Sequence, residues 1–555
     1  MIRSFLFLRP FAVCSLAGMS LLHAGLPADM PTPTIPTPAW TDYLEAAGRS
    51  DSRQRYSVNE RIGADAFYKK GIRGEGVRVA NIEPGTLWRG HAIFTGIPED
   101  RLYYGVQATA DYSDLHATGV CGAIAAGSAD NPRAMGIAPK ADLYSASFFK
   151  KPQNAAAPPF SHTSLLTTYR RFFGKADVIN TSWGTVWPTP TVEFYSYLLD
   201  SFCRAHPETL FVAAAGNTGT LPNPAQRGKV STIASGFNNI AVGAQGNAPA
   251  YDELCPNSCH LPVDFINPHT NKQEGKRAGV DITAPGEMIV VPTINPKDPK
   301  RNDLFFKASG TSVAAPIVAG SACLLISSAR RNEFPAEATD ARVLKAVLLN
   351  AADKPKGWDN GAHHAAYRDQ ADVWLTTQGL DYKFGAGFLN LAQALKQHGE
   401  AAPSKLWNLS SLKQGQSKTI PLGNIQSGST VTATLAWFQD CAIKGFAQAP
   451  GDAELIRLLQ DGKPSPVEKP EIDYRGMADF NLELCRIDPT APGKPIPVAA
   501  SATPNNTVEH IRFQIPQDGD YCLKITFDRM TYGASPAQGE PCAAAWSITP
   551  PPATR

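Results

Sequence analysis

Short apolar runs alternate with helix-like segments over residues 57–397, and this alternation restricts the possible folds more than any other feature of the chain. Strand-like runs lie at residues 77–82, 141–146, 177–180 and 210–215. Helix-like segments lie near residues 119–126, 164–173 and 192–205. Strands and helices in alternation favour a parallel sheet with helices on both faces. The sequence therefore predicts an α/β domain over residues 57–400.

The pattern changes after about residue 402, where glycine-rich turns separate short runs of alternating apolar and polar residues. Such runs lie at residues 430–437, 479–484, 508–513 and 521–527. Alternation with a period of two, interrupted by frequent turns, is typical of a small antiparallel sandwich. We expect a second domain, a jelly-roll-like β-sandwich, over residues 401–555.

The N-terminus has the pattern of a secretory signal peptide. Arg3 precedes a mostly apolar stretch over residues 5–22, which Arg9 and Pro10 interrupt. A basic start followed by an apolar middle predicts a signal peptide over residues 1–28, with a linker or short pro-segment over residues 29–56. The alternative is a membrane anchor. No later stretch has 18 consecutive apolar residues, so we expect an exported (secreted or periplasmic) mature chain that does not span a membrane.

The charge balance argues against one class of partner. The formal net charge is +2, and no long run of one sign is present. Proteins that bind nucleic acid usually concentrate basic residues on one face. We therefore expect no nucleic-acid partner.

Ten cysteines are present, and Cys14 would leave with the signal peptide. Nine then remain, so at least one is unpaired within the chain. Cys255 and Cys259 flank a three-residue loop and could close a small ring. The four C-terminal cysteines, Cys441, Cys485, Cys522 and Cys542, fit two bridges in an oxidising compartment, with the connectivity left open. Cys121 and Cys323 lie in apolar segments and are expected to be buried thiols. Paired C-x-x-C spacing is absent, so no metal ligands are predicted.

The strongest local signal for chemistry is the segment Ser-Gly-Thr-Ser-Val-Ala-Ala-Pro at residues 309–316. An apolar stretch over residues 317–326 follows, as expected for a helix in the middle of a core. Ser312 would then lie at the helix N-terminus, where unpaired amides and the helix dipole favour a developing negative charge. Taken alone, the segment also fits a serine that only caps a helix.

Further motifs show that the chain resembles the subtilisin-like serine peptidase family. The segment at residues 310–316 matches the family's Gly-Thr-Ser-x-Ala-x-Pro motif, and Ala-Ala-Gly-Asn at 214–217 matches its oxyanion segment. His-Ala-Thr-Gly-Val-Cys-Gly at 116–122 corresponds to the histidine motif His-Gly-Thr-His-Val-Ala-Gly. Minor landmarks of the family follow in its order at residues 177–184, 284–286 and 384–387. The family fold is a parallel sheet with helices on both faces.

The resemblance implies a role for each residue that matches a motif. Ser312 would be the nucleophile and His116 the base that takes its proton. The Asn217 side chain and the Ser312 backbone N–H would bind the oxyanion. The walls of the P1 pocket would be Ser182, Trp183, Gly184, Ala214, Ala215 and Gly216. The implied substrates are proteins or peptides, bound as an added strand near residues 144–149 and 180–184, with an apolar P1 residue.

The third member of the triad departs from the family pattern. The family has Val-Ile-Asp-x-Gly after its first strand, whereas this chain reads Asn-Ile-Glu-Pro-Gly at residues 81–85. A glutamate at position 83 can hold an imidazole and stabilise its charged form as an aspartate does. We expect Glu83 to be the partner of His116, with Asp114 as the next candidate and Asp111 also nearby.

Two other functions remain as alternatives to this interpretation. The chain could be a catalytically inactive homologue that binds proteins or peptides, or an esterase, although the G-x-S-x-G elbow is absent around Ser312. No cofactor is required for the chemistry. Structural calcium is common in the family, but no acidic loop identifies its ligands. The C-terminal domain could bind substrate, bind calcium for stability, or act as a stabilising lid on the catalytic domain.

Overall fold

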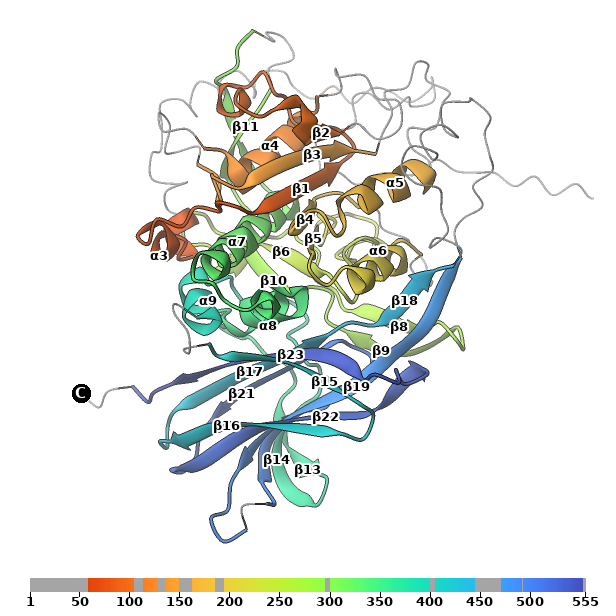
Figure 1. The fold of residues 1–555 in the computed structure, drawn as a ribbon, viewed down its shortest axis with the longest axis vertical. Coiled ribbons are helices and arrows are strands. Elements are labelled where there is room, and N and C mark those ends of the chain that lie inside the picture. The colour runs from red at the N-terminus through yellow and green to blue at the C-terminus, as the bar shows by residue number, and fades with distance from the viewer. Residues whose placement is uncertain are drawn as a thin grey trace, which may run out of the picture.

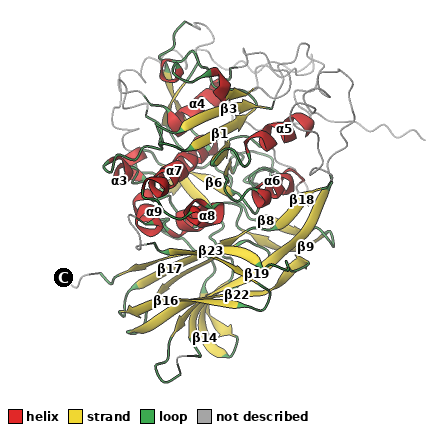
Figure 2. Ribbon diagram, viewed as in Figure 1, coloured by secondary structure: helices red, strands yellow, loops and turns green. Residues whose placement is uncertain are grey.

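The computed structural model of the chain describes residues 58–103, 113–127, 135–148, 162–184, 194–294, 300–399, 405–444, 471–491 and 493–552. The predicted signal peptide (1–28) and linker (29–56), and Asp111, lie outside these residues. Helices surround a sheet in the first part of the chain, and strands alone form most of the second part (Figures 1 and 2).

The first part is built on a parallel sheet. In spatial order its strands are β10 (Ile282–Pro285), β6 (Ile240–Gly246), β5 (Leu210–Ala214), β4 (Val178–Thr181), β1 (Arg78–Glu83), β3 (Asp142–Ser147) and β2 (Leu102–Tyr103). All neighbours on this path are parallel. A short strand, β7 (Glu253–Leu254), pairs antiparallel with β6. The predicted α/β fold is confirmed.

Helices pack around this sheet, and two strand pairs lie outside it. The helices are α3 (Asp65–Tyr68), α4 (Leu115–Ala125), α5 (His162–Phe172), α6 (Phe194–Ala205), α7 (Thr311–Arg331), α8 (Ala341–Asn350) and α9 (Leu391–His398). Within the described ranges, single-turn 3₁₀ helices lie at Ala92–Phe94, Glu99–Arg101 and Ala336–Thr339. Two separate hairpins join β8 (Val263–Asn267) to β9 (Lys272–Arg277) and β11 (Ile289–Pro292) to β12 (Phe305–Ala308).

Helix α7 is the centre of this domain. It packs against β4, β5, β6 and β10, and residues 311–329 are all buried. The helix is long and apolar enough to cross a membrane, but its apolar window is wholly buried inside the protein. An apolar surface on all sides is what a helix enclosed by strands and other helices requires. The expectation of a core helix after Ser312 is therefore confirmed.

Two sheets form the second part. One contains β13 (His363–Tyr367), β14 (Gln370–Thr376), β20 (Ile496–Ser501), β19 (Ile472–Arg486), β22 (Gly519–Gly533) and β16 (Ser417–Ile425), with β18 (Asp440–Ile443) beside β19. The other contains β15 (Trp407–Leu412), β23 (Glu540–Thr549), β17 (Thr430–Trp437) and β21 (Val508–Gln514). Trp437 and Phe480 are in contact across a buried apolar cluster to which both sheets contribute. This two-sheet arrangement agrees with the sandwich pattern seen in the sequence.

The division at residue 400 is crossed by one hairpin. Strands β13 and β14 precede residue 400, but β14 pairs in parallel with β20 at the edge of the C-terminal sheet. The sequence analysis assigned no strand to this hairpin. A hairpin that pairs with a strand more than a hundred residues away ties the two parts together.

The two parts also share one hydrophobic core. The cluster around α7 continues through helix α8, which contacts β5 on one side and β17 and β23 on the other. Trp407, Phe438, Met477 and Tyr532 of the C-terminal part belong to this cluster. Apolar side chains of both parts are therefore removed from water along this contact.

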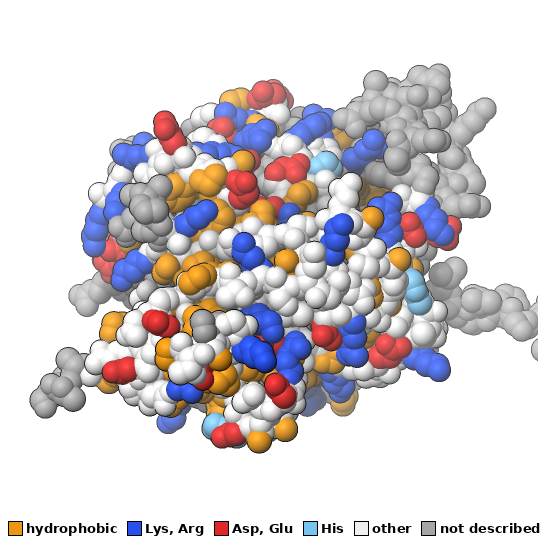
Figure 3. All heavy atoms as spheres, turned by 60° about the horizontal axis from the view of Figure 1, so that its bottom comes forward, with side chains coloured by type: hydrophobic (Ala, Val, Ile, Leu, Met, Phe, Trp, Pro, Cys, Tyr) orange, Lys and Arg blue, Asp and Glu red, His pale blue; other side chains and the backbone are white. Residues whose placement is uncertain are grey.

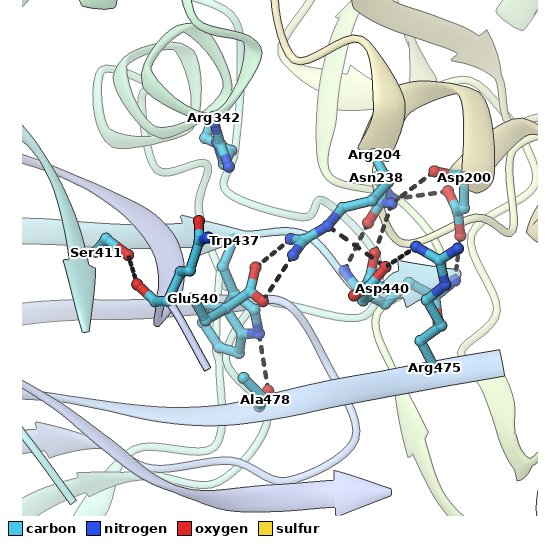
Figure 4. A network of polar contacts seen from close by, with 12 residues as sticks. Asp200, Arg204, Asn238, Arg342, Ser411, Trp437, Asp440, Arg475, Ala478 and Glu540 are labelled. Carbon is cyan, nitrogen blue, oxygen red and sulfur yellow. Dashed lines mark hydrogen bonds and ion pairs between the residues drawn. The ribbon is translucent and has the colours of Figure 1, made fainter. Parts of the chain in front are cut away.

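A polar network surrounds the end of helix α6 at the same interface (Figure 4). The Arg204 guanidinium donates hydrogen bonds to both carboxylate oxygens of Glu540, and its Nε lies 3.6 Å from Asp440 Oδ1. Asp200, wholly buried one turn earlier, accepts hydrogen bonds from the backbone N–H groups of Phe237 and Asn238 at 2.8 and 2.9 Å, and from the side chain of Gln439. Burial raises the pKa of Asp200, despite these hydrogen bonds. The charges are therefore paired or hydrogen bonded where the two parts meet, as burial requires.

The predicted disulfides are wrong. All nine cysteines in the described ranges are buried and none forms a disulfide. The Cys255 and Cys259 sulfurs have different partners, the Asn257 side chain and Thr218. Cys441 lies in β18 and Cys542 in β23, on different sheets. Cys485 and Cys522 face each other across β19 and β22 but remain thiols. The expectation that Cys121 and Cys323 are buried thiols is confirmed.

We predict that Arg204→Met destabilises the protein, because the largely buried Glu540 carboxylate loses its cation. Breaking a buried ion pair typically costs about 3–5 kcal/mol. The control is Lys69→Met, which removes an exposed pair with Asp65 (side chains 77% and 40% exposed) and should cost less than about 1 kcal/mol. Thermal unfolding of both variants measures the difference. Equal midpoints for the two variants would show that the interface pair contributes nothing.

Candidate active site

The carboxyl ends of β1, β4 and β5 bring three of the predicted segments to one edge of the sheet. These strands are neighbours in the order β5, β4, β1, and all are parallel. Glu83 ends β1, Ser182 follows β4, and Asn217 lies three residues beyond β5. Ligand sites of open parallel sheets form at this edge. The strand pairing therefore gathers side chains that are far apart in the sequence.

Glu83 and His116 are in contact. Glu83 Oε2 lies 3.3 Å from His116 Nδ1, and both side chains are buried. The other carboxylate oxygen, Oε1, accepts a hydrogen bond of 2.9 Å from the backbone N–H of Ser182. Oε2 makes no well-aligned hydrogen bond, and its contact with Nδ1 becomes an ion pair when the imidazole is protonated. The glutamate thus lies behind the imidazole despite its additional methylene.

Asp114 has a different role. It is the N-cap of helix α4, and its side chain accepts hydrogen bonds from the backbone N–H groups of His116 and Ala117. Capping of this kind satisfies amides that have no partner in the first turn. The carboxylate of Asp114 is therefore used by the backbone, and Glu83 is the acid in contact with the imidazole.

The imidazole is arranged to accept a proton. Burial by itself lowers the pKa of His116, but the charge of Glu83 and its contact with Nδ1 outweigh burial and raise the pKa above its ordinary value, and the charge of Asp114 adds to this. Nε2 is buried and has no hydrogen-bond partner among the described residues. With Nδ1 turned toward Glu83, Nε2 is the nitrogen available to act as a base.

Ser312 lies in the first turn of helix α7. The N-cap residue is Gly310, with φ of +141°, a conformation that favours glycine over residues with a side chain. Backbone N–H groups in the first turn have no acceptor within the helix. The Ser312 hydroxyl and its N–H therefore lie at the positive end of a long buried helix, and its side chain is only 2% exposed.

Thr311 fixes the orientation of the Asn217 amide. The Thr311 backbone N–H donates to Asn217 Oδ1 at 2.8 Å, and the Thr311 hydroxyl lies 3.1 Å from the same oxygen. A backbone N–H can only donate, so the side-chain atom that faces it must be the amide oxygen. The NH₂ group of Asn217 is therefore on the other side, available as a donor.

One small cavity joins most of the predicted residues. It is lined by Ser182, Trp183, Gly184, Ala214, Gly216, Asn217, Thr218, Ser231, Thr311 and Ser312. Ala215 does not line it and packs instead with Cys259 and Val280. His116 is also not in the lining, and is connected to the cavity through Glu83 and Ser182.

Trp183 lines the cavity, and buried residues on its other side hold its indole in place. Its Nε1–H donates to the buried Tyr169 hydroxyl at 3.1 Å, and its ring lies 4.5 Å from that of Phe148. Tyr169 is in turn hydrogen bonded to Thr181. Because the indole is anchored on two sides, Trp183 forms a fixed wall rather than a movable cover.

Sequence reasoning missed several residues of the site. Thr311 was matched to a motif without a role, and Thr218 directly follows the oxyanion segment, so both had a positional signal. Ser231 had none. It enters the cavity because its backbone N–H donates to the Ala215 carbonyl at 2.8 Å and its hydroxyl to the Ala214 carbonyl at 3.1 Å.

The assembled groups are suited to nucleophilic chemistry at a carbonyl. They comprise a hydroxyl at a helix N-terminus, a buried imidazole backed by a carboxylate, and an amide side chain that lines the same cavity as the hydroxyl. A base that receives the hydroxyl proton and donors that bind a developing oxyanion are what acyl transfer needs.

Comparison with known proteins identifies the catalytic domain. The family model described as "Subtilase family" matches residues 100–387, just over half of the chain. His116, Asn217 and Ser312 lie within the matched stretch, and Glu83 precedes it.

Three relatives give the range of similarity. "Subtilisin-like protease SBT6.1" of Arabidopsis thaliana is 30% identical over 56% of this chain and 27% of its own length. "Mycosin-4" of Mycobacterium tuberculosis is 28% identical over 61% of this chain and 73% of its own length. "Subtilisin Savinase" of Lederbergia lenta is 29% identical over 48% of this chain and 81% of its own length. The chain thus spans little more than a quarter of the plant protein.

We predict that Glu83→Gln slows reaction of Ser312 with a fluorophosphonate on the order of 10⁴-fold, because the imidazole loses the carboxylate that holds it. The wild-type rate should rise with pH through a pKa above the ordinary histidine value, since only the neutral imidazole accepts a proton. Without the Glu83 charge, burial dominates, so the residual rate should rise at lower pH. Labelling rates measured against pH test both effects.

Asp114→Asn is the control for this prediction, because asparagine caps a helix as well as aspartate does. It should retain most of the labelling rate. If Glu83→Gln reacts normally while Asp114→Asn is inert, the assignment of Glu83 is wrong.

Proposed function

The chain belongs to the subtilase family, and on that premise we propose that it is a serine endopeptidase in which Ser312 is the nucleophile, His116 the general base and Glu83 the group that orients the imidazole. The observation that supports this most strongly is the shared cavity of Ser312 and Asn217, in which Thr311 holds the amide oxygen and leaves the NH₂ group available.

The reaction follows from these positions. Ser312 Oγ attacks the carbonyl carbon of the scissile bond while its proton passes to His116 Nε2. The Asn217 NH₂ and the Ser312 backbone N–H bind the oxyanion of the tetrahedral intermediate. His116 returns the proton to the leaving amine, and a water molecule then hydrolyses the acyl-enzyme by the same steps.

Glu83 stabilises the imidazolium that forms during each proton transfer. Its Oε1 is already bound by the Ser182 N–H, so the carboxylate is fixed before the substrate arrives. Neither the longer side chain nor the preceding strand prevents contact with Nδ1. This contact favours an active enzyme over the alternative of an inactive homologue that only binds peptides.

The proposed substrate is a protein or peptide bound in an extended conformation. The segments near residues 144–149 and 180–184 would pair with its backbone as two flanking strands. The walls of the cavity beside Ser312 include Trp183, Ala214 and two glycines. We infer that the P1 residue is apolar.

Export and the role of the C-terminal domain are also part of the proposal. Residues 1–28 have the basic start and apolar middle of a signal peptide. The shared core and the buried polar network support a stabilising role for the C-terminal domain.

Among the residues with described positions, no group of three or more His, Cys, Asp and Glu side chains is placed to bind a metal, so a calcium role has no identified ligands there. On the face shown in Figure 3, basic and acidic side chains are interspersed.

We predict that a fluorophosphonate probe labels the wild type and not Ser312→Ala, because only a serine activated by a base reacts with it. Asn217→Ala should still be labelled but should cleave peptides about 10²–10³-fold more slowly, the magnitude known for such a donor in subtilisin. Wild type that neither reacts with the probe nor cleaves peptides would support the inactive, peptide-binding alternative.

We also predict the P1 preference. Digestion of a peptide library by the wild type, with Ser312→Ala as the blank, should give cleavage after apolar residues, because Trp183 and Ala214 line the cavity beside Ser312. Cleavage mainly after charged residues would contradict this preference while leaving the catalytic assignment intact.

A further inference from the structure

The loop that carries Asn217 is held on two opposite sides by side chains. On the side of the serine helix, the Gly216 N–H donates to the Thr311 hydroxyl at 3.0 Å, and Thr311 also binds Asn217. On the other side lies the thiol of Cys259, a residue to which no part of the proposed reaction assigns a role.

Cys259 contacts the residues immediately before and after Asn217. Its backbone N–H donates to the Gly216 carbonyl at 2.9 Å. Its sulfur accepts a hydrogen bond of 3.2 Å from the Thr218 N–H and lies 3.0 Å from the Thr218 hydroxyl. A side-chain carbon added at Gly216 would lie 3.1 Å from the same sulfur. The thiol therefore packs directly against the loop.

The hydrogen-bond pattern gives the thiol two roles. The Thr218 hydroxyl donates to the Gln226 carbonyl at 2.7 Å, which uses its only hydrogen. Its oxygen is then free to accept, so the Cys259 S–H can donate to it while the sulfur accepts the Thr218 N–H. Both Cys259 and Thr218 are at most 1% exposed, so no water replaces these contacts.

The position of the loop matters because Asn217 carries the oxyanion donor. Gly216 has φ of +114°, which glycine adopts without strain, so the backbone on this side of Asn217 has more conformational freedom than one with a side chain. Asn217 lies between Gly216 and Thr218, and the Cys259 residue binds both. A small displacement of an oxyanion donor is enough to lower a rate strongly.

We propose that Cys259 is a positioning residue for the oxyanion site: its thiol and backbone N–H hold Gly216 and Thr218 so that the Asn217 NH₂ faces the reacting carbonyl. This inference rests on the proposed peptidase function. Cys259 does not touch the substrate in this account, and it acts only through Asn217.

Cys255 is a matched control in the same segment of chain. It is also a buried thiol, but its sulfur donates to the Asn257 side chain at 3.0 Å. Cys255→Ala removes a buried thiol four residues from Cys259 without removing a contact to Gly216, Asn217 or Thr218. We expect its turnover to match that of the wild type.

The test is a double-mutant cycle on peptide hydrolysis with Cys259→Ala and Asn217→Ala. Cys259→Ala should lower kcat about 10- to 100-fold with little change in KM. In the Asn217→Ala background the same substitution should have almost no further effect, because the group that it positions is gone. Cys259→Ser should recover much of the rate, since a hydroxyl can make the same hydrogen bonds over a shorter reach.

Several results would overturn the proposal. One is an equal loss of kcat from Cys259→Ala with and without Asn217, and another is an equal loss in Cys255→Ala. If Cys259→Ala does not fold, the comparison is made with Cys259→Ser, which must then show a smaller loss in the Asn217→Ala background than in the wild type.

A readout that needs no turnover separates this proposal from the function on which it rests. Hydrogen exchange of peptides covering residues 214–219 should be faster in Cys259→Ala than in the wild type or Cys255→Ala. Wild type that cleaves nothing would refute the peptidase function, and exchange would still decide the positioning role. Unchanged exchange in Cys259→Ala would refute that role.

Discussion

The buried carboxylate of Glu83 connects the sheet to the imidazole, and the geometry of the site depends on it. A buried charge is stable only where hydrogen bonds and an opposite charge compensate its lost hydration. The Ser182 N–H supplies one partner and His116 the other. The Ser182 N–H is within reach because β1 and β4 are parallel neighbours that end at the same edge. The exchange of aspartate for glutamate at this position is accommodated without a change in that pairing.

The second constraint is the shared core of the two parts. Helix α8 is enclosed between β5 and the strands β17 and β23, and helix α6 ends in the charged network of Arg204, Glu540 and Asp440. The same helix α6 binds, through Asp200, the loop that precedes β6. The C-terminal part is therefore packed into the catalytic domain, and it is not attached only by a linker.

Much of the fold could be predicted from sequence because its signals are local. The strand over residues 430–437 was found from its alternation of apolar and polar residues, and the helix after Ser312 from its continuous apolar stretch. Burial on one face or on all sides leaves such a direct pattern in the sequence. The hairpin β13–β14 was missed because its residues are largely exposed and its partner β20 is remote. The disulfides were wrong because cysteine spacing does not indicate where a sulfur points.

The candidate site divides in the same way. His116, Ser312 and Asn217 were found through motifs. Their positions, on helix α4, on helix α7 and in the loop after β5 respectively, are consistent with those motifs. Ser231 and the anchoring of Trp183 by Tyr169 depend on packing between distant segments, which no local pattern encodes. The most direct measurement of the whole account is a crystal structure with a peptide boronic acid. The account predicts boron bonded to Ser312 Oγ, a boronate oxygen bound by the Asn217 NH₂, and His116 Nε2 within hydrogen-bond distance. A boronate oxygen turned to solvent, with the imidazole remote from it, would contradict the account.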